Sequence, residues 1–144
     1  SCNLFLFYFF VTSYNRDVGR CAMQGVLRLA GALVGTGILL GAFGAHGLAS
    51  VLSVEHMAVY KTAVQYQIFN GIGLLVLSLG ASRLTVLGGL NRLIGVLVAS
   101  IGIFSGSLYA YLITGASFWV TCTPIGGIGL VTAWVWLAAC GRLK

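Results

Sequence analysis

Long apolar runs, separated by short breaks that carry the charges, dominate the chain. A run of 26 uncharged residues follows Arg28, one of 21 follows Lys61 and one of 49 follows Arg92. Because a helix needs about 20 apolar residues to cross the hydrocarbon core of a bilayer, the first two runs predict one span each and the third predicts two. We expect the spans near residues 27–48, 62–81, 92–113 and 122–140.

The third run is expected to turn within a polar break at residues 116–127, which contains Trp119 and Pro124. The composition agrees with membrane spans, since 59% of the residues are hydrophobic and only 7% are charged, whereas a soluble domain carries about 25% charged residues. We therefore predict an all-α membrane protein, in which residues 23–144 form a single domain, a four-transmembrane-helix bundle with glycine-rich packing faces.

The basic residues predict how the chain is threaded. With the four predicted spans, seven bases fall on one side of the membrane and only Lys61 falls on the other; the seven are Arg16, Arg20, Arg28, Arg83, Arg92, Arg142 and Lys144. Cytoplasmic loops of membrane proteins carry an excess of Lys and Arg, so we expect both termini to be cytoplasmic. The net charge of +6 is scattered between apolar runs, which indicates topology and not a nucleic-acid partner.

The first 22 residues do not read as a span or as a secretory signal. Their apolar stretch, residues 4–11, is too short to cross a bilayer, and the bases follow it, whereas in a signal peptide they precede it. Residue 1 is Ser, and Met23 lies just ahead of the first span. We therefore interpret residues 1–22 as a non-native or upstream leader and expect them to be dispensable; an interfacial anchor is the alternative.

Small residues recur at spacings of three and four in the first and third spans. In membranes such stripes let helix backbones approach closely. We expect these glycines to pack helices together, either within one chain, where spans one and three would bury them, or in a dimer; they are Gly31, Gly35, Gly37, Gly41, Gly102 and Gly106. Gly129 and Ala133 offer the same kind of face on span four.

A histidine closes the stretch GAFGAHGL at residues 41–48, at the end of the first span. In one interpretation His46 caps the span through a hydrogen bond. In a second, it lines a pocket for a small polar ligand or a lipid headgroup together with Tyr66, Gln67, Ser105 and Tyr109. Polar side chains within spans usually face the bundle interior or a cavity, which agrees with either interpretation.

A third interpretation joins His46 to Glu55 and His56 as a metal site for hydrolysis. Two histidines and one carboxylate do bind metals, but the spacing lacks the helical HExxH register. The four cysteines show no CxxC or metal-type spacing. We therefore assign no metal site, no cofactor and no catalytic residue, and we favour a protein without enzymatic activity.

Four blocks in this order resemble the small membrane proteins of domain-of-unknown-function family 423, which includes the transmembrane protein 256-like proteins. The blocks are GAFGAHGL at 41–48, YKTAVQYQ at 60–67, FSGSLYAYLITG at 104–115 and TPIGG at 123–127. The resemblance runs from Met23 to the C-terminus, with Asn70 where the family commonly has a histidine. It implies a four-helix protein with no established biochemical activity, in the bacterial cytoplasmic (inner) membrane or, alternatively, in a mitochondrial membrane.

These observations predict a structural, partner-docking or small-ligand- or lipid-binding bundle. The expected partners are the lipid bilayer and either a second copy or another membrane protein, with no nucleic acid. A small-solute transporter or channel subunit is one alternative, although the spans supply no continuous polar path. A metal-dependent membrane hydrolase is the other.

Overall fold

The computed structural model of the chain describes residues 2–144, with side chains from Ala22 onwards. Its elements, in order, are α1 (Cys2–Phe43), the π-helical turn η1 (Gly44–Leu48), α2 (Val54–Gly80), β1 (Leu84–Val86), α3 (Leu90–Thr114), α4 (Phe118–Cys140) and β2 (Gly141–Leu143). The side chains of most of the predicted leader, residues 1–22, lie outside the described part. Its interpretation as a leader, with the protein itself starting at Met23, therefore stays a prediction.

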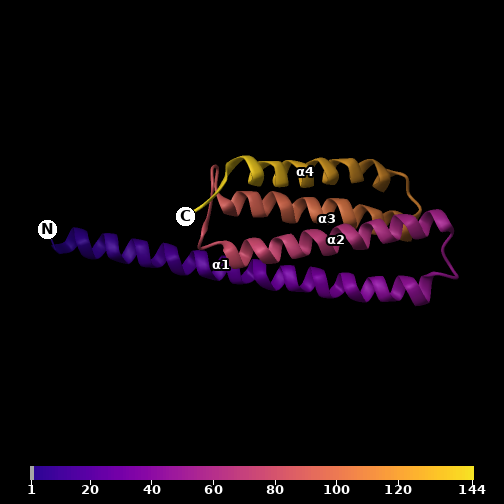
Figure 1. The fold of residues 1–144 in the computed structure, drawn as a ribbon, viewed down its shortest axis with the longest axis horizontal. Helices are drawn as coiled ribbons and strands as arrows, with labels where there is room; N and C mark the ends of the chain where they lie inside the picture. The colour runs from indigo at the N-terminus through magenta and orange to yellow at the C-terminus, as the bar shows by residue number, and fades with distance from the viewer. Residues whose placement is uncertain (1) are drawn as a thin grey trace.

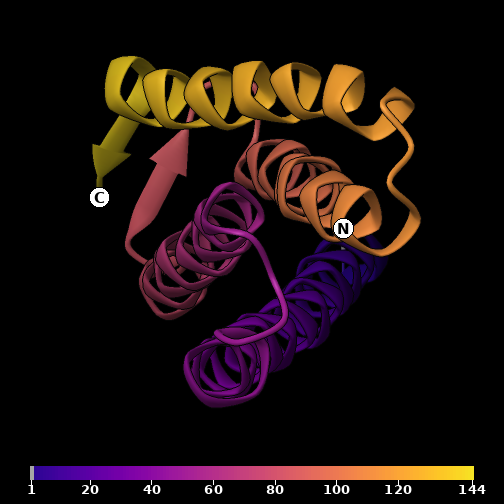
Figure 2. The same cartoon turned by 90° about the vertical axis from the view of Figure 1, so that its right-hand side faces the viewer.

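Within residues 22–144, four helices are long and apolar enough to cross a membrane, which confirms the predicted fold class. They run alternately up and down (Figure 1), with α1 packed on α2, α2 on α3 and α3 on α4. Viewed from the end in Figure 2, α1 and α4 lie on opposite sides of the α2–α3 pair. Of the residues in the most apolar stretch of each helix, 44% are buried in α2 and 39% in α3, against 17% in α4 and 11% in α1. The helices α2 and α3 are therefore central, and α1 and α4 are peripheral.

The helix α2 begins at Val54, well ahead of the span predicted to start near residue 62. Ser53 caps this helix, because its side-chain oxygen accepts a hydrogen bond of 3.2 Å from the backbone N–H of His56, as serine commonly does at a helix N-terminus. The sequence predicts that Glu55 and Lys61 lie in the connection between the first two spans, whereas both lie within the first turns of α2.

The turn between α3 and α4 is shorter than predicted. Gly115 has a φ of +68° and ends α3 in the left-handed conformation, with its backbone N–H bonded to the carbonyl of Tyr111. Phe118 then begins α4, and Pro124 lies inside that helix instead of in the turn. Proline is tolerated within membrane helices because neighbouring groups satisfy the freed backbone.

A two-stranded clasp, absent from the sequence predictions, ties the α2–α3 connection to the C-terminus. The antiparallel strands β1 and β2 pair Leu84 with Leu143 and Val86 with Gly141. The indole N–H of Trp136 adds a hydrogen bond of 2.8 Å to the carbonyl of Leu87. This pairing places the end of α2, the start of α3 and the end of α4 together; we call this end of the bundle the clasp end.

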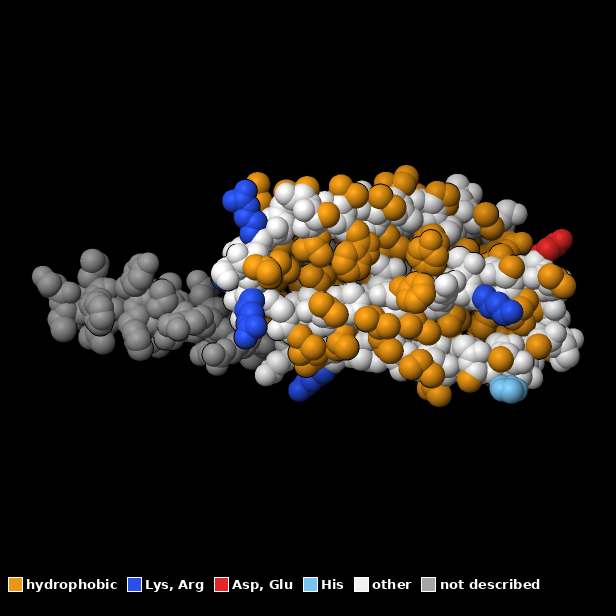
Figure 3. Space-filling model, in the orientation of Figure 1, with side chains coloured by type: hydrophobic (Ala, Val, Ile, Leu, Met, Phe, Trp, Pro, Cys, Tyr) orange, Lys and Arg blue, Asp and Glu red, His pale blue; other side chains and the backbone are white. Residues whose placement is uncertain are grey.

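Charged groups collect at the two ends of the bundle and not along its length. Figure 3 shows several Lys and Arg side chains at one end of the bundle, and a Lys or Arg, an acidic and a His side chain toward the other. The clasp and its flanks carry Arg83, Arg92 and Arg142, while Glu55 and Lys61 lie in the first turns of α2. We call the latter the Lys61 end. Which end faces the cytoplasm stays a prediction.

The closest helix approach lies between α3 and α4. A Cβ built on Gly126 would stand 2.5 Å from the backbone nitrogen of Phe104, and one on Gly129 would overlap the Ser100 hydroxyl. Ala133, one turn further along α4, is 1% exposed. The small-residue face predicted on span four is therefore buried against α3.

The predicted packing glycines divide into two groups. A Cβ on Gly37 would stand 2.5 Å from Ile68, and one on Gly41 would stand 3.6 Å from Val64, so both glycines face α2. A Cβ built on any of the other four would meet nothing within 4 Å; these are Gly31, Gly35, Gly102 and Gly106. Within one chain these four do not pack against another helix. The alternative of a dimer contact stays a prediction.

Candidate functional site

Gln67 is the central polar residue of the bundle and is only 6% exposed. Its Nε2 donates hydrogen bonds of 2.9 Å to the carbonyl of Leu33 and to the hydroxyl of Thr36, both on α1. Its Oε1 accepts a bond of 3.0 Å from the hydroxyl of Tyr109 on α3. One amide therefore joins three helices, and both of its N–H groups are used in doing so.

Asn70 makes the corresponding connection to α4. Its Oδ1 accepts a hydrogen bond of 2.8 Å from the indole N–H of Trp134, and its Nδ2 donates to the carbonyl of Tyr66. Ser107 and Thr123 share a further bond of 2.8 Å between α3 and α4. Interhelical hydrogen bonds of this kind hold membrane bundles together, so these polar groups act as structural ties.

The five residues of the predicted pocket are only partly brought together. Gln67 and Tyr109 are hydrogen bonded, while Tyr66 is 43% exposed and its ring lies 4.6 Å from that of Phe104. Ser105 is 3% exposed, and its hydroxyl has no hydrogen-bond partner. His46 is exposed within η1; the partners of Gln67 are those given above, so His46 is not joined to it.

The residues of the hydrolase interpretation are also not gathered into a site. The ring of His56 lies 5.8 Å from that of Tyr111 in an edge-to-face arrangement. Within residues 22–144, no three His, Cys, Asp or Glu side chains are grouped in a way that would hold a metal ion. Nothing in this part of the chain therefore favours metal chemistry at His46.

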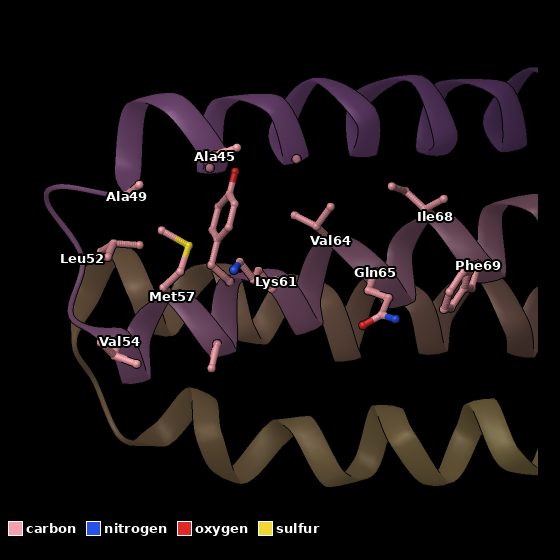
Figure 4. Close-up of a pocket in the computed structure, with 14 residues that line it drawn as sticks. Ala45, Ala49, Leu52, Val54, Met57, Lys61, Val64, Gln65, Ile68 and Phe69 are labelled. Carbon is pink, nitrogen blue, oxygen red and sulfur yellow. The ribbon is translucent and has the colours of Figure 1, made fainter.

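A groove of about 850 Å³ runs along the seam between α1, η1 and α2 at the Lys61 end (Figure 4). Its α1 and η1 side is formed by small residues, namely Gly41, Gly44, Ala45 and Ala49. Its α2 side, with the turn that precedes it, carries larger and mostly apolar residues: Leu52, Val54, Met57, Ala58, Tyr60, Val64, Ile68 and Phe69. The groove is partly open to the surroundings of the bundle, and within a membrane those surroundings are lipid.

Tyr60 holds the two walls of this groove in place. Its hydroxyl donates a hydrogen bond of 2.6 Å to the carbonyl of Leu40 on α1. Its ring lies so close to Gly44 that a Cβ at that position would overlap it. Two glycines of GAFGAHGL, Gly41 and Gly44, thus make room for side chains of α2. The hollow beside them remains because Ala45 and Ala49 are too small to fill it.

Two polar side chains stand in the otherwise apolar lining, Lys61 and Gln65. They are four residues apart on α2, so they lie on the same face one turn from each other, as Figure 4 shows. The sequence predictions used Lys61 to bound a span and to assign topology, and the block YKTAVQYQ contains both residues, but neither was predicted to line a site. The sequence does contain a signal for this face: Lys61 and Gln65 are four residues apart on one helix, and apolar Val64 and Ile68 lie beside them.

Comparison with known proteins places the chain in a family. Residues 40–127 match the family described as "Protein of unknown function (DUF423)". A Bacillus subtilis protein, "UPF0382 membrane protein YwdK", is 36% identical over 110 residues, which are 76% of this chain and 88% of the relative. The chain belongs to the DUF423 family. The resemblance inferred from the four sequence blocks is thereby confirmed.

Two further relatives come from Haemophilus influenzae and Escherichia coli. A Haemophilus influenzae "UPF0382 membrane protein" is 38% identical over 104 residues, covering 70% of this chain and 80% of the relative. The Escherichia coli "UPF0382 inner membrane protein YgdD" is 30% identical over 108 residues, covering 74% and 82%. No solved structure matches the chain. With the four apolar helices, these names confirm a multi-pass protein of the inner membrane, surrounded by lipid.

Proposed function

We propose that this DUF423 protein is a lipid-binding membrane protein, in which the groove between α1, η1 and α2 holds one acyl chain. The observation that carries the proposal is the groove itself, with its volume of about 850 Å³ and its mostly apolar lining. That volume lies within the range of about 300–1,000 Å³ that is typical of small-molecule sites. A chain lying there would fill space that Ala45 and Ala49 leave open.

The buried polar groups favour this function over solute transport. A transport path needs polar groups that are free to exchange partners with a solute, whereas the side-chain N–H groups of Gln67 are both bonded to α1 and the Oδ1 of Asn70 is bonded to Trp134. These ties hold the helices that frame the groove. The groove lies on the seam between two spans and is partly open, which favours an apolar ligand that enters from the bilayer.

Filling the groove tests the proposal. Ala45→Phe places a ring in the hollow, while Ala32→Phe places the same ring on an exposed part of α1 outside the groove lining. We expect native mass spectrometry of the protein in mild detergent to find a retained phospholipid on the wild type and on Ala32→Phe. Ala45→Phe should lose it. Equal retention by all three proteins would contradict the proposal.

The threading predicted from the bases extends this proposal to a leaflet. With both termini cytoplasmic, the Lys61 end lies at the outer face of the inner membrane, and the groove receives its chain from the outer leaflet. The seven-to-one distribution of bases supports this orientation, since cytoplasmic loops are enriched in Lys and Arg. The labelling experiment that tests it is given in the Discussion.

A second copy of the chain is the second candidate partner. The small residues Gly95, Ala99, Gly102 and Gly106 form an exposed stripe along α3, and a Cβ on each of the three glycines would meet nothing within 4 Å. Stripes of this kind support close helix pairing in membranes. Gly102→Leu and Gly106→Leu should then convert a dimer to a monomer in sedimentation measurements; a wild type that is monomeric at all concentrations would rule this contact out.

A further inference from the structure

We infer that the groove selects a lipid with an anionic headgroup, which Lys61 binds at the phosphate while the acyl chain lies against the α1–α2 seam. The inference rests on the proposed acyl-chain function and names the class of its ligand. It comes from the charge of the groove: of the residues that line it, Lys61 is the only one with a charged side chain.

The depth of Lys61 suits a headgroup contact. The helix α2 has 27 residues, which is more than the about 20 needed to cross the hydrocarbon core, so its first turns extend into the interface. Lys61 follows Val54 by seven residues, or about 10 Å along the helix axis. From there a lysine side chain lays its apolar stem along the groove and carries its amine outward to the headgroups.

The residues that line the groove include no acidic side chain to pair with Lys61, so its positive charge is available to a ligand. The chain has two acidic residues, Asp17 and Glu55, and neither belongs to the groove lining. Glu55 precedes Lys61 by six residues on the same helix, a spacing that puts the two side chains on different faces. An anionic headgroup therefore supplies the charge that the groove itself lacks.

Gln65 adds a neutral contact one turn deeper than Lys61. Its amide can donate hydrogen bonds to the ester oxygens that join a headgroup to its acyl chains, and it is exposed within the groove. These oxygens are common to all phospholipids, so Gln65 contributes to binding without choosing the headgroup. Lys61 determines which headgroup is preferred. A zwitterionic headgroup carries its own positive charge, which repels the Lys61 amine, whereas an anionic headgroup does not.

Competition between two lipids with identical acyl chains tests the inference. The protein is placed in nanodiscs that contain equal amounts of phosphatidylglycerol and phosphatidylcholine. The protein is then released from the nanodiscs, and native mass spectrometry counts the lipids of each kind that remain bound to it. We expect the wild type and Lys61→Arg to retain phosphatidylglycerol preferentially. Lys61→Gln should lower that preference about fivefold, the effect expected of one interfacial lysine.

Two further variants separate failure of this inference from failure of the proposed function. Arg92→Gln removes one positive charge at the clasp end and should leave the preference unchanged, whereas an equal drop there would show that net charge alone is responsible and would overturn the inference. Ala45→Phe should release both lipids. If Ala45→Phe does so while the wild type shows no preference, the acyl-chain function stands and the role of Lys61 falls.

If Ala45→Phe instead retains both lipids, the groove is not the binding site and both proposals fall. Circular dichroism and a single gel-filtration peak establish that each variant is folded before its lipids are counted. A wild type that carries a second copy of the chain and no lipid in the groove would likewise overturn the inference.

Discussion

The indole N–H of Trp134 donates a hydrogen bond of 2.8 Å to the Oδ1 of Asn70, and so joins α4 to α2 across the bundle. The same indole packs against Gly73, where a Cβ would overlap the ring. Asn70 is 7% exposed, which leaves little room for water to replace a lost partner. The pair is therefore a tertiary contact whose strength can be measured directly.

We predict that Asn70 and Trp134 are energetically coupled. In a double-mutant cycle with Asn70→Leu and Trp134→Phe, the coupling free energy of unfolding should be about 0.6 kcal/mol and at most about 1.7 kcal/mol, the average and the maximum found for hydrogen bonds between membrane helices. Reversible unfolding in mixed micelles gives the four free energies. Trp134→Phe combined with Gln65→Leu is the control and should be additive, because Gln65 lies on the groove face. A coupling indistinguishable from that control would contradict the prediction.

Gln67 should matter more to stability than Gln65, although both are glutamines on α2. Gln67→Leu deprives Thr36 and Tyr109 of their shared partner, and we expect a loss of about 1–2 kcal/mol in the free energy of unfolding. Gln65→Leu exchanges an exposed amide for an apolar group and should change stability little. Thermal unfolding in detergent compares the two, and equal melting temperatures would show that the three-helix tie contributes nothing.

The sequence predicts the four helices because hydropathy and charge act locally along the chain. Gln67 and Tyr109 were both selected as polar residues within spans, and the structure joins them. His46 was selected for its isolated ring, yet it is exposed. The direction in which a side chain points at the end of a helix depends on the local backbone, and here His46 lies within a π-helical turn, η1.

The glycines illustrate what the pattern alone does not specify. Small residues at spacings of three and four mark a face for close approach, but the partner of that face depends on how the helices are arranged. Gly37 and Gly41 face α2, while Gly102 and Gly106 face outward. The groove was missed for the same reason, since its small wall and Lys61 belong to different helices. The clasp, formed by residues far apart in the sequence, carries no local signal of similar strength.

Two glycine substitutions distinguish the buried from the exposed face. Gly126→Ala places a Cβ 2.5 Å from the backbone nitrogen of Phe104, and forcing α3 and α4 apart should cost about 1–3 kcal/mol of unfolding free energy. Gly106→Ala meets nothing within 4 Å and should leave a single chain at least as stable as the wild type, since alanine favours helix over glycine. Chemical unfolding of both variants checks this, and a greater loss for Gly106→Ala would contradict it.

The two ends of the bundle should face opposite sides of the membrane, with the clasp end in the cytoplasm. Ser50 lies in the turn between η1 and α2, and Ser82 lies in the turn that follows α2; both are exposed. In a background with the four native cysteines replaced by serine, Ser50→Cys should react with a membrane-impermeant maleimide in intact cells. Ser82→Cys should react only after permeabilisation, because the bases near it favour the cytoplasm. The reverse pattern would invert the topology and move the groove to the inner leaflet.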